Sequence, residues 1–413
     1  MPDINLDIAF YNATQQELFQ GFPNAYRINS IVRDGITITE DEFLAYMMFM
    51  DQDDNYVGYR TYEDLRNLIS SRLGDIKNYI SFINNSIQSI VPPERMNNAR
   101  FTERIGISLG LSIVNKLHSL TAADWKKIPE TNAKPTFDFQ IPIASTGTNY
   151  IQVENKGCVV DDNSYKRTTV SNRYSEIREK KEYVRNEETK NQIQLHQNLY
   201  YGTIGVLDNR PDSIARIWLV DPPAFEIKME PRKYKLLARL RYYLDEFKNI
   251  GVKKKITDAL AFRIKEIEEA KDYNQFNFKK LDDKFPISGG YYLYMEGNVF
   301  ANVDANEAFG RVFLIEEKQR IIPYLLSFPK AIMRLIVRQD FESILNYEYN
   351  PDFIKENISV LIRFTKSEFF EMNLSEKLNF VFNEKSKFFE AVYFGKVSHT
   401  SDGRIFGALK NEK

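Results

Sequence analysis

Three charged residues lie where strands would otherwise be apolar. Asp138 interrupts the apolar run at 136–144, and Glu154 and Lys156 follow the apolar positions of a second run at 149–159. A charge inside a strand is disfavoured unless a partner or a metal ion balances it. Glu154 and Lys156 are two residues apart, so that in a strand both side chains project from the same face.

The turn between the two runs decides whether the carboxylates meet. Gly147 can adopt the positive φ angle that a tight turn needs. A three-residue loop ending at Gly147 pairs Ala144 with Thr148, so that the numbers of paired residues add up to 292. Asp138 then faces Glu154. A bulge in either strand would change this register by one residue.

Two facing carboxylates are suitable ligands for a hard divalent cation, Mg²⁺ or in its place Mn²⁺. Such an ion polarises a phosphoryl oxygen and lowers the pKa of a bound water. Lys156 beside it can orient the water or, with a depressed pKa, accept its proton. These residues together predict a metal-dependent phosphodiesterase. The structural alternative is a cross-strand charge ladder without a catalytic function.

A helix is predicted before the hairpin, and a helix and strands after it. Apolar residues between Asn98 and Leu120 recur at the spacing of a helix that packs on a sheet. Glu103, near the start of this helix, is an additional acid that can reach a second metal ion or its waters. After the hairpin, the pattern predicts a polar helix at about 171–201 and strands at 202–207 and 214–220.

This succession of elements and charges resembles the PD-(D/E)XK nuclease superfamily, whose restriction-endonuclease-like fold has an αβββαβ core. The resemblance covers about 98–221. It implies that Asp138 and Glu154 bind the metal ion together with the backbone carbonyl of Asn155. Lys156 is then the catalytic lysine.

The resemblance also implies an activity, that of a Mg²⁺-dependent endonuclease that cleaves DNA in a bacterial restriction or phage-defence system. Cleavage of both strands needs two active sites, so we expect a homodimer on double-stranded DNA, with defence-system proteins as further partners. The chain departs from the family pattern because Phe137, and not proline, precedes Asp138. Two alternatives stay open: an RNA-directed nuclease, and a catalytically silent nuclease-like subunit that binds DNA or serves assembly.

A second E-x-K triplet competes with the first. Glu316 ends the apolar run RVFLI, Lys318 follows it, and Asp304 precedes Glu316 by twelve residues. The hairpin site is favoured, because a helix with Glu103 precedes it and a helix and two strands follow it. Asp304, Glu316 and Lys318 remain the alternative site.

Length and composition predict several domains. A chain of 413 residues accommodates two or three. We predict an α/β protein, α+β overall, with a helical acidic region at 1–95, the nuclease core at 96–225 and an α+β region at 226–413. The one cysteine, Cys158, excludes a disulfide framework, and we expect it to be a buried thiol and not a nucleophile.

Helical spacing also predicts helices at 63–91, at 232–271 and over much of 321–389, and a strand pair is predicted around 291–303 and 311–316. The sequence has no apolar run of ~18 residues that would predict a transmembrane helix. The first residues lack the basic and apolar regions of a signal peptide. We therefore expect a soluble, cytoplasmic protein.

The net charge of -1 conceals an uneven distribution, with -7 in 1–95, +2 in 96–225 and +4 in 226–413. We expect the acidic 1–95 region to serve assembly, partner binding or occlusion of the nuclease. In 228–255, ten Lys or Arg stand against three acidic residues, and tyrosines are interleaved. The alternative for that run is a solvated helix face with an apolar Leu/Tyr stripe. The candidate phosphate-binding residues are Lys166, Arg167, Arg173, Lys233, Lys235 and Arg239.

Overall fold

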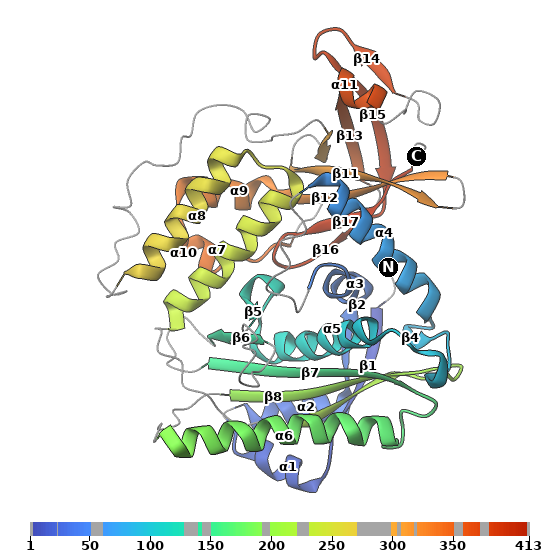
Figure 1. Ribbon diagram of the computed structural model, residues 1–413, viewed down its shortest axis with the longest axis vertical. Coiled ribbons are helices and arrows are strands. Elements are labelled where there is room, and N and C mark those ends of the chain that lie inside the picture. Colours follow the sequence, from blue (N-terminus) through green and yellow to red (C-terminus); the bar gives the residue numbers. More distant parts are fainter. Residues whose placement is uncertain are drawn as a thin grey trace. The chain divides into compact units, whose positions relative to one another are not determined.

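Helices and sheets occur together in both parts of the chain, which confirms the prediction of an α+β protein (Figure 1). The computed structural model describes residues 3–22, 24–50, 61–127, 139–142, 150–191, 199–220, 231–270, 299–303, 307–317, 320–350, 358–371 and 380–410. The first unit comprises Met1–Tyr56 and Ser71–Lys235, and the second comprises Val57–Ser70 and Leu236–Lys413. Within the described residues, no helix is long and apolar enough to cross a membrane.

A mixed sheet, seven-stranded as far as the chain is described, forms the centre of the first unit. Its strands lie in the order β2-β1-β9-β8-β7-β6-β5. Neighbours β7 and β8 are parallel, as are β1 and β9, and the other neighbours are antiparallel. The strands are β1 (Asp3–Phe10), β2 (Ile36–Thr39), β5 (Lys126–Lys127), β6 (Phe139–Pro142), β7 (Tyr150–Val160), β8 (Leu199–Asp208) and β9 (Ala215–Val220).

Two long helices, α5 (Ala99–His118) and α6 (Thr168–Asn191), cover opposite faces of this sheet (Figure 1). Helix α5 begins where predicted, because the side chain of Asn98 accepts a hydrogen bond from the Phe101 amide at 3.0 Å. Helix α6 connects β7 to its parallel neighbour β8, a connection that parallel strands require. The other helical elements of the unit are α1 (Ala13–Gln20), α2 (Ala25–Asp34), α3 (Glu40–Phe49), η1 (Pro93–Arg95) and η2 (Ala122–Asp124).

Residues 1–95 differ from the separate helical region that we predicted, because β1 belongs to the central sheet. Strand β1 pairs in parallel with β9, and Leu6 lies opposite Ala215. Ile4, Leu6 and Ile8 are buried, so that every second residue faces the core, which is the period of a strand. The start of the chain therefore completes the sheet that contains β7.

The helix predicted at 63–91 ends at Tyr79, and a hairpin follows it. Asn84 and Asn85 have φ angles of 51° and 57°, the left-handed conformation that a two-residue hairpin turn needs. The isoleucines of the hairpin continued the apolar spacing of the helix, and the Asn-Asn pair was the overlooked turn signal. The elements are α4 (Tyr62–Tyr79), β3 (Ile80–Ile83) and β4 (Ser86–Ser89).

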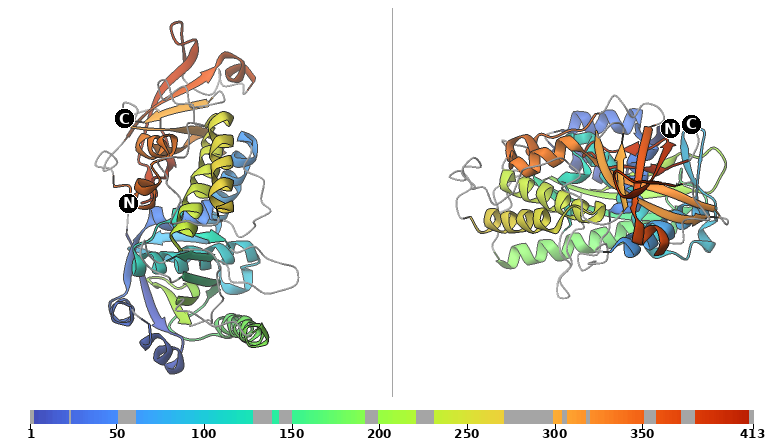
Figure 2. Two further views of the ribbon diagram at one scale, coloured as in Figure 1. Left: turned by 90° about the vertical axis from the view of Figure 1, so that its left-hand side faces the viewer. Right: turned by 90° about the horizontal axis from the view of Figure 1, so that it is seen from above.

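An antiparallel sheet, eight-stranded as far as the chain is described, forms the second unit, in the order β14-β15-β13-β10-β11-β12-β17-β16. The predicted strand pair is confirmed where it is described, because β10 pairs with β11. The predicted basic helices are α7 and α8, which lie side by side (Figures 1 and 2). The strands are β10 (Val299–Val303), β11 (Ala308–Glu317), β12 (Arg320–Pro329), β13 (Ile358–Thr365), β14 (Val381–Asn383), β15 (Phe388–Gly395), β16 (Ser398–His399) and β17 (Ile405–Ala408). The helices are α7 (Pro231–Ile250), α8 (Lys254–Glu269), α9 (Lys330–Arg338), α10 (Phe341–Leu345) and α11 (Lys366–Glu371).

The prediction that 321–389 is largely helical is wrong, because β12, β13 and β14 lie in this range. In β13, Ile358, Val360, Ile362 and Phe364 are buried, and the residues between them are half-buried. This alternation was a strand signal in the sequence. Strand β12 is a continuous apolar run, and such a run does not distinguish a strand from a buried helix by periodicity alone.

A buried ion pair ties α7 to the segment before β17 in the second unit. Arg404 Nη2 lies 2.6 Å from Glu246 Oε1, and the two side chains are 4% and 7% exposed. Asp402 accepts a hydrogen bond from the hydroxyl of Tyr242 beside this pair. Burial raises the pKa of Glu246. The negative charge of Glu246 is therefore tolerated because Arg404 is present.

We predict that Arg404→Met lowers the free energy of unfolding by about 3–5 kcal/mol, because it removes the cation from a buried carboxylate. Lys387→Met is the matched control. It breaks the exposed pair of Lys387 with Glu384, at 2.9 Å, and is expected to cost about 0–1 kcal/mol. Urea unfolding of the three proteins measures both values, and equal losses in the two variants would contradict this account.

Candidate functional site

The strand pair β6–β7 has the register that the turn predicted. Phe139 pairs with Val153 and Gln140 with Gln152, so that the numbers of paired residues add up to 292. The register prediction is therefore confirmed over the described pairs. Asp138, the first expected metal ligand, lies outside the described residues.

Helix α5 rests directly on the backbone of β7. A Cβ atom added to Gly157 would lie 1.8 Å from the carbonyl oxygen of Thr102, and one added to Gly106 would lie 2.4 Å from the carbonyl carbon of Lys156. Only glycine permits so close an approach of the helix to the strand. The glycines of α5 are thus packing positions, and they hold the strand in place next to Lys156.

Asn155 projects toward α5, on the face opposite Glu154. Its Oδ1 accepts a hydrogen bond from the hydroxyl of Thr203 on β8 at 2.8 Å. A Cβ atom on Gly110 would lie 2.0 Å from the same oxygen. The side chain of Asn155 therefore belongs to the interface with α5, and its backbone carbonyl is the group that the nuclease resemblance uses.

Glu154 is fully buried on the face of β7 that α6 covers. Lys180 of α6 places Nζ 2.6 Å from Oε1 and 2.7 Å from Oε2. Lys156 Nζ lies 3.1 Å from Oε1. Burying a carboxylate is expensive unless cations and hydrogen bonds balance it, and here two ammonium groups do so.

Further charges of α6 extend this arrangement. Lys156 Nζ also lies 3.7 Å from Glu176 Oε2, and Arg173 Nη1 lies 2.8 Å from Glu176 Oε1. Glu176 and Lys180 are four residues apart, so that both lie on one face of the helix. We call these residues the Glu154 cluster: Glu154, Lys156, Arg173, Glu176 and Lys180.

Glu176 and Lys180 are the members of the cluster that the sequence analysis did not assign to the site. Lys180 stands in Glu179-Lys180-Lys181, within the helix that the sequence predicts to be polar. Its side chain is only 24% exposed and reaches Glu154. The available signal was its position three residues after Ile177, which is fully buried.

Glu103 is not brought into the Glu154 cluster. It is the fifth residue of α5, which lies on the face of the sheet opposite Glu154. Within the described part of the chain, no group of three or more His, Cys, Asp or Glu side chains is arranged to hold a metal ion. Among the described residues, the Glu154 carboxylate is the group suited to a hard cation, because both of its oxygens already face a positively charged group.

Of the three residues of the alternative site, Glu316 lies within the described part of the chain. This residue is exposed near the end of β11, and it pairs with Ile321 of the antiparallel strand β12. Asp304 and Lys318 lie outside the described residues. Strand β7, in contrast, is followed by a helix and a parallel strand, which is the predicted context of the first site.

Cys158 follows the cluster on the same face of β7. The thiol is buried among Ile177, Ile204 and Val206, and burial raises its pKa to about 12. A thiol with such a pKa is a poor nucleophile near pH 7. The prediction of a buried free cysteine is confirmed.

The basic residues of the first unit that were expected to contact phosphate have partners within the fold. Lys166 Nζ lies over the ring of Tyr11, 4.5 Å from its centroid. Arg167 Nε lies 3.0 Å from Asp161 Oδ1. Both side chains remain partly exposed at the protein surface, and these contacts fix their orientation.

The basic residues of α7 are placed differently from our expectation. Arg239 is buried, and it donates hydrogen bonds to the carbonyl groups of Ile344 and Tyr347. Lys233 is buried as well, and Lys235 Nζ lies 3.7 Å from the buried Asp124. The apolar Leu/Tyr stripe of the alternative interpretation is present on this helix. We therefore leave Lys233, Lys235 and Arg239 out of the proposed nucleic-acid surface.

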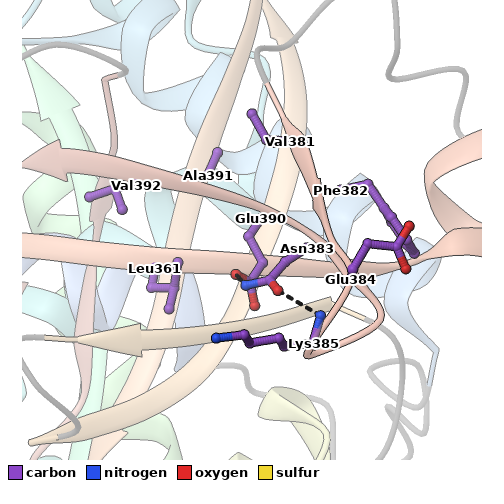
Figure 3. A pocket seen from close by; sticks show the side chains of 9 residues that line it. All are labelled: Leu361, Val381, Phe382, Asn383, Glu384, Lys385, Glu390, Ala391 and Val392. Carbon is purple, nitrogen blue, oxygen red and sulfur yellow. Dashed lines mark hydrogen bonds between the residues drawn. The ribbon is translucent and has the colours of Figure 1, made fainter.

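A hollow in the second unit carries charges at one end of its sheet (Figure 3). The backbone amide of Lys385 donates a hydrogen bond to Asn383 Oδ1 at 3.0 Å. Glu390 is held by Arg363, whose Nε lies 2.7 Å from Oε1. Much of its wall is apolar, formed by Leu361, Val381, Ala391 and Val392, so we place the candidate site at the Glu154 cluster and not in this hollow.

Comparison with known proteins gives no match, whether with protein-family models, with curated proteins or with solved structures. The proposed function therefore rests on the resemblance of the sequence and on the described residues. Among these, the Glu154 cluster combines a buried charge, two lysines and a defined position in the sheet.

His118 at the end of α5 has a polar role in packing. Its Nε2 lies 2.9 Å from the hydroxyl of Tyr201 and 3.2 Å from Nδ2 of Asn24. Burial, and after it the charge of Arg27, lowers the pKa of His118 to about 4. The imidazole is therefore neutral in the folded protein at pH 7.

His118 predicts a loss of stability in acid. Its folded-state pKa lies below the ordinary value, so the unfolded chain binds a proton between about pH 6.5 and 4 that the folded chain does not bind. The neutral imidazole therefore contributes fully to the free energy of unfolding above about pH 6.5. At pH 5 about 2 kcal/mol of this free energy is lost. Between pH 7 and pH 5, the free energy of unfolding of His118→Gln is expected to fall by about 2 kcal/mol less than that of the unmodified protein. Urea unfolding at the two pH values measures both changes. Equal losses would contradict a neutral, half-buried imidazole at His118.

Proposed function

We propose that this chain is a divalent-metal-dependent phosphodiesterase of the PD-(D/E)XK type that cleaves DNA. The observation that carries the proposal is the position of Glu154 and Lys156 next to each other on one face of β7, 3.1 Å apart. They occur in a strand pair whose register is the one that would place Asp138 opposite Glu154. An acid and a lysine at this spacing, beside a second acid, are what the proposed chemistry requires.

The order of elements supports the same proposal. Helix α5 precedes three antiparallel neighbours, β5, β6 and β7, and α6 then leads to β8, which is parallel to β7. This succession corresponds to the αβββαβ core that the sequence resemblance implies. Strands β1, β2 and β9 are additions at the β8 side of the sheet.

Each residue has a defined role in the proposal. Glu154, with Asp138 and the carbonyl of Asn155, holds Mg²⁺ or Mn²⁺, which supplies positive charge at the scissile phosphate. Lys156 orients the attacking water through a hydrogen bond that its ammonium group donates. Glu176, 3.7 Å from Lys156 Nζ, keeps this ammonium group in position.

A polyanionic substrate is favoured by the charge around the site. The Glu154 cluster contains three cationic and two anionic side chains, and Lys166 and Arg167 lie just before α6. Such charges attract a phosphate backbone without reading its sequence. Double-stranded DNA, a homodimer and a defence role in the cytoplasm are parts of the proposal that follow from the family resemblance.

We expect the protein to cleave plasmid DNA with Mg²⁺ and not with EDTA. Asp138→Ala and Lys156→Ala are expected to lower the rate by at least about 100-fold, the contribution of a positioned acid–base group or metal ligand. Lys116→Ala, which removes an exposed lysine from α5, is the matched control and is expected to retain full activity. The same series with RNA as substrate tests the RNA-directed alternative.

Metal-dependent cleavage that survives both Asp138→Ala and Lys156→Ala would refute this site. Cleavage that is lost instead in Glu316→Ala would move the site to the second unit. In either case the nuclease activity itself would stand.

A second candidate function is a nuclease-like subunit that binds DNA or serves assembly without catalysis. One observation favours it, since both oxygens of Glu154 are already paired with Lys180. Glu154, Lys156 and Lys180 would then form a purely structural charge network. This candidate predicts DNA binding without cleavage in the presence of Mg²⁺ or Mn²⁺.

A further inference from the structure

Lys180 occupies the side of the Glu154 carboxylate that a chelated cation would use. Its Nζ is nearly equidistant from Oε1 and Oε2, at 2.6 and 2.7 Å. Lys156, in contrast, lies 3.1 Å from Oε1. A divalent ion cannot take both oxygens of Glu154 while the ammonium group of Lys180 remains between them.

The burial of the two partners is unequal. The side chain of Glu154 is 0% exposed, whereas that of Lys180 is 24% exposed. Lys180 has a flexible stem of four carbons on the surface helix α6, so it can turn toward water by rotations of its own side chain. Glu154 cannot follow it. A buried carboxylate that loses a cation is strongly destabilised unless another cation takes that place.

We propose that Lys180 is the resident counter-ion of Glu154 and that a divalent metal ion binds by displacing it. The inference rests on the proposed function, because it takes Glu154 to be a metal ligand. The ammonium group keeps the buried carboxylate neutralised in the metal-free protein and competes with the metal for the same oxygens. Lys180 thereby sets the metal affinity of the site.

Binding of Mn²⁺ to the full-length chain, followed by the electron paramagnetic resonance of free Mn²⁺, tests the competition. Lys180→Gln keeps a hydrogen-bond donor beside Glu154 and removes the charge. It is expected to bind Mn²⁺ at least about tenfold more tightly, given the strength of a charge a few ångströms away. Lys180→Arg keeps the charge and is expected to bind as the unmodified protein does. Lys180→Met, a second neutral side chain, is expected to reproduce the gain.

Arg178→Gln is the matched control. It removes a positive charge from the same helix, at a side chain that is 54% exposed and paired with Glu182, and it is expected to change the affinity by less than about twofold. Adding Glu154→Gln to Lys180→Gln is expected to abolish the tight binding. Equal affinity of the unmodified protein and both neutral variants, or tight binding that survives Glu154→Gln, would overturn the proposal.

Displacement itself has a separate readout. Acetylation of lysine side chains, followed by peptide mass spectrometry, is expected to modify Lys180 several-fold faster when Mn²⁺ is saturating, while the exposed Lys116 reacts at an unchanged rate. An unchanged rate at Lys180 would overturn displacement. DNA cleavage by a protein whose Lys180 stays protected would overturn displacement and leave the proposed function intact. Tight Mn²⁺ binding by Lys180→Gln without any DNA cleavage would support displacement and contradict the proposed function.

Discussion

A carboxylate without access to water needs a cation at its side, and the candidate site depends on this constraint at Glu154. The residue lies in the middle of β7 with α6 above its face of the sheet, and its side chain is fully buried. Lys156 from the same strand and Lys180 from α6 supply the balancing charges. In a structural network these two lysines suffice. In a nuclease, one of them must give way to a metal ion.

The remainder of the first unit holds this strand in place from the other side. Helix α5 approaches β7 so closely that Gly106 and Gly157 have no room for a Cβ atom. The contact fixes the strand next to Lys156, and thereby the direction in which Glu154 and Lys156 project. The N-terminal residues take part in the same sheet, since Asp7 of β1 pairs with Arg216 of β9. Part of the acidic charge of 1–95 therefore belongs to the fold, and is not available for a separate regulatory domain.

Local signals in the sequence predicted the frame of the site, and tertiary contacts decided the rest. The apolar spacing between Asn98 and Leu120 located α5, and Gly147 led to the register of β6 with β7, because both patterns are local. The helices predicted at 63–91 and 321–389 failed in part, since apolar spacing reports burial and does not always distinguish a helix from a strand. Lys180 was overlooked because its partner is 26 residues away on another element. The buried Ile177, three residues earlier, indicated which face of the helix Lys180 lies on, but not which residue it contacts.

The central claim is that Glu154 is a metal ligand whose second cation is exchangeable. It is tested most directly by a crystal structure of the protein soaked in Mn²⁺, with anomalous scattering recorded at the manganese edge. The account predicts an anomalous peak at about 2 Å from a Glu154 carboxylate oxygen, together with Lys180 Nζ turned away from that carboxylate. A structure without the peak at a saturating Mn²⁺ concentration, in which Lys180 still bridges both oxygens, would contradict it.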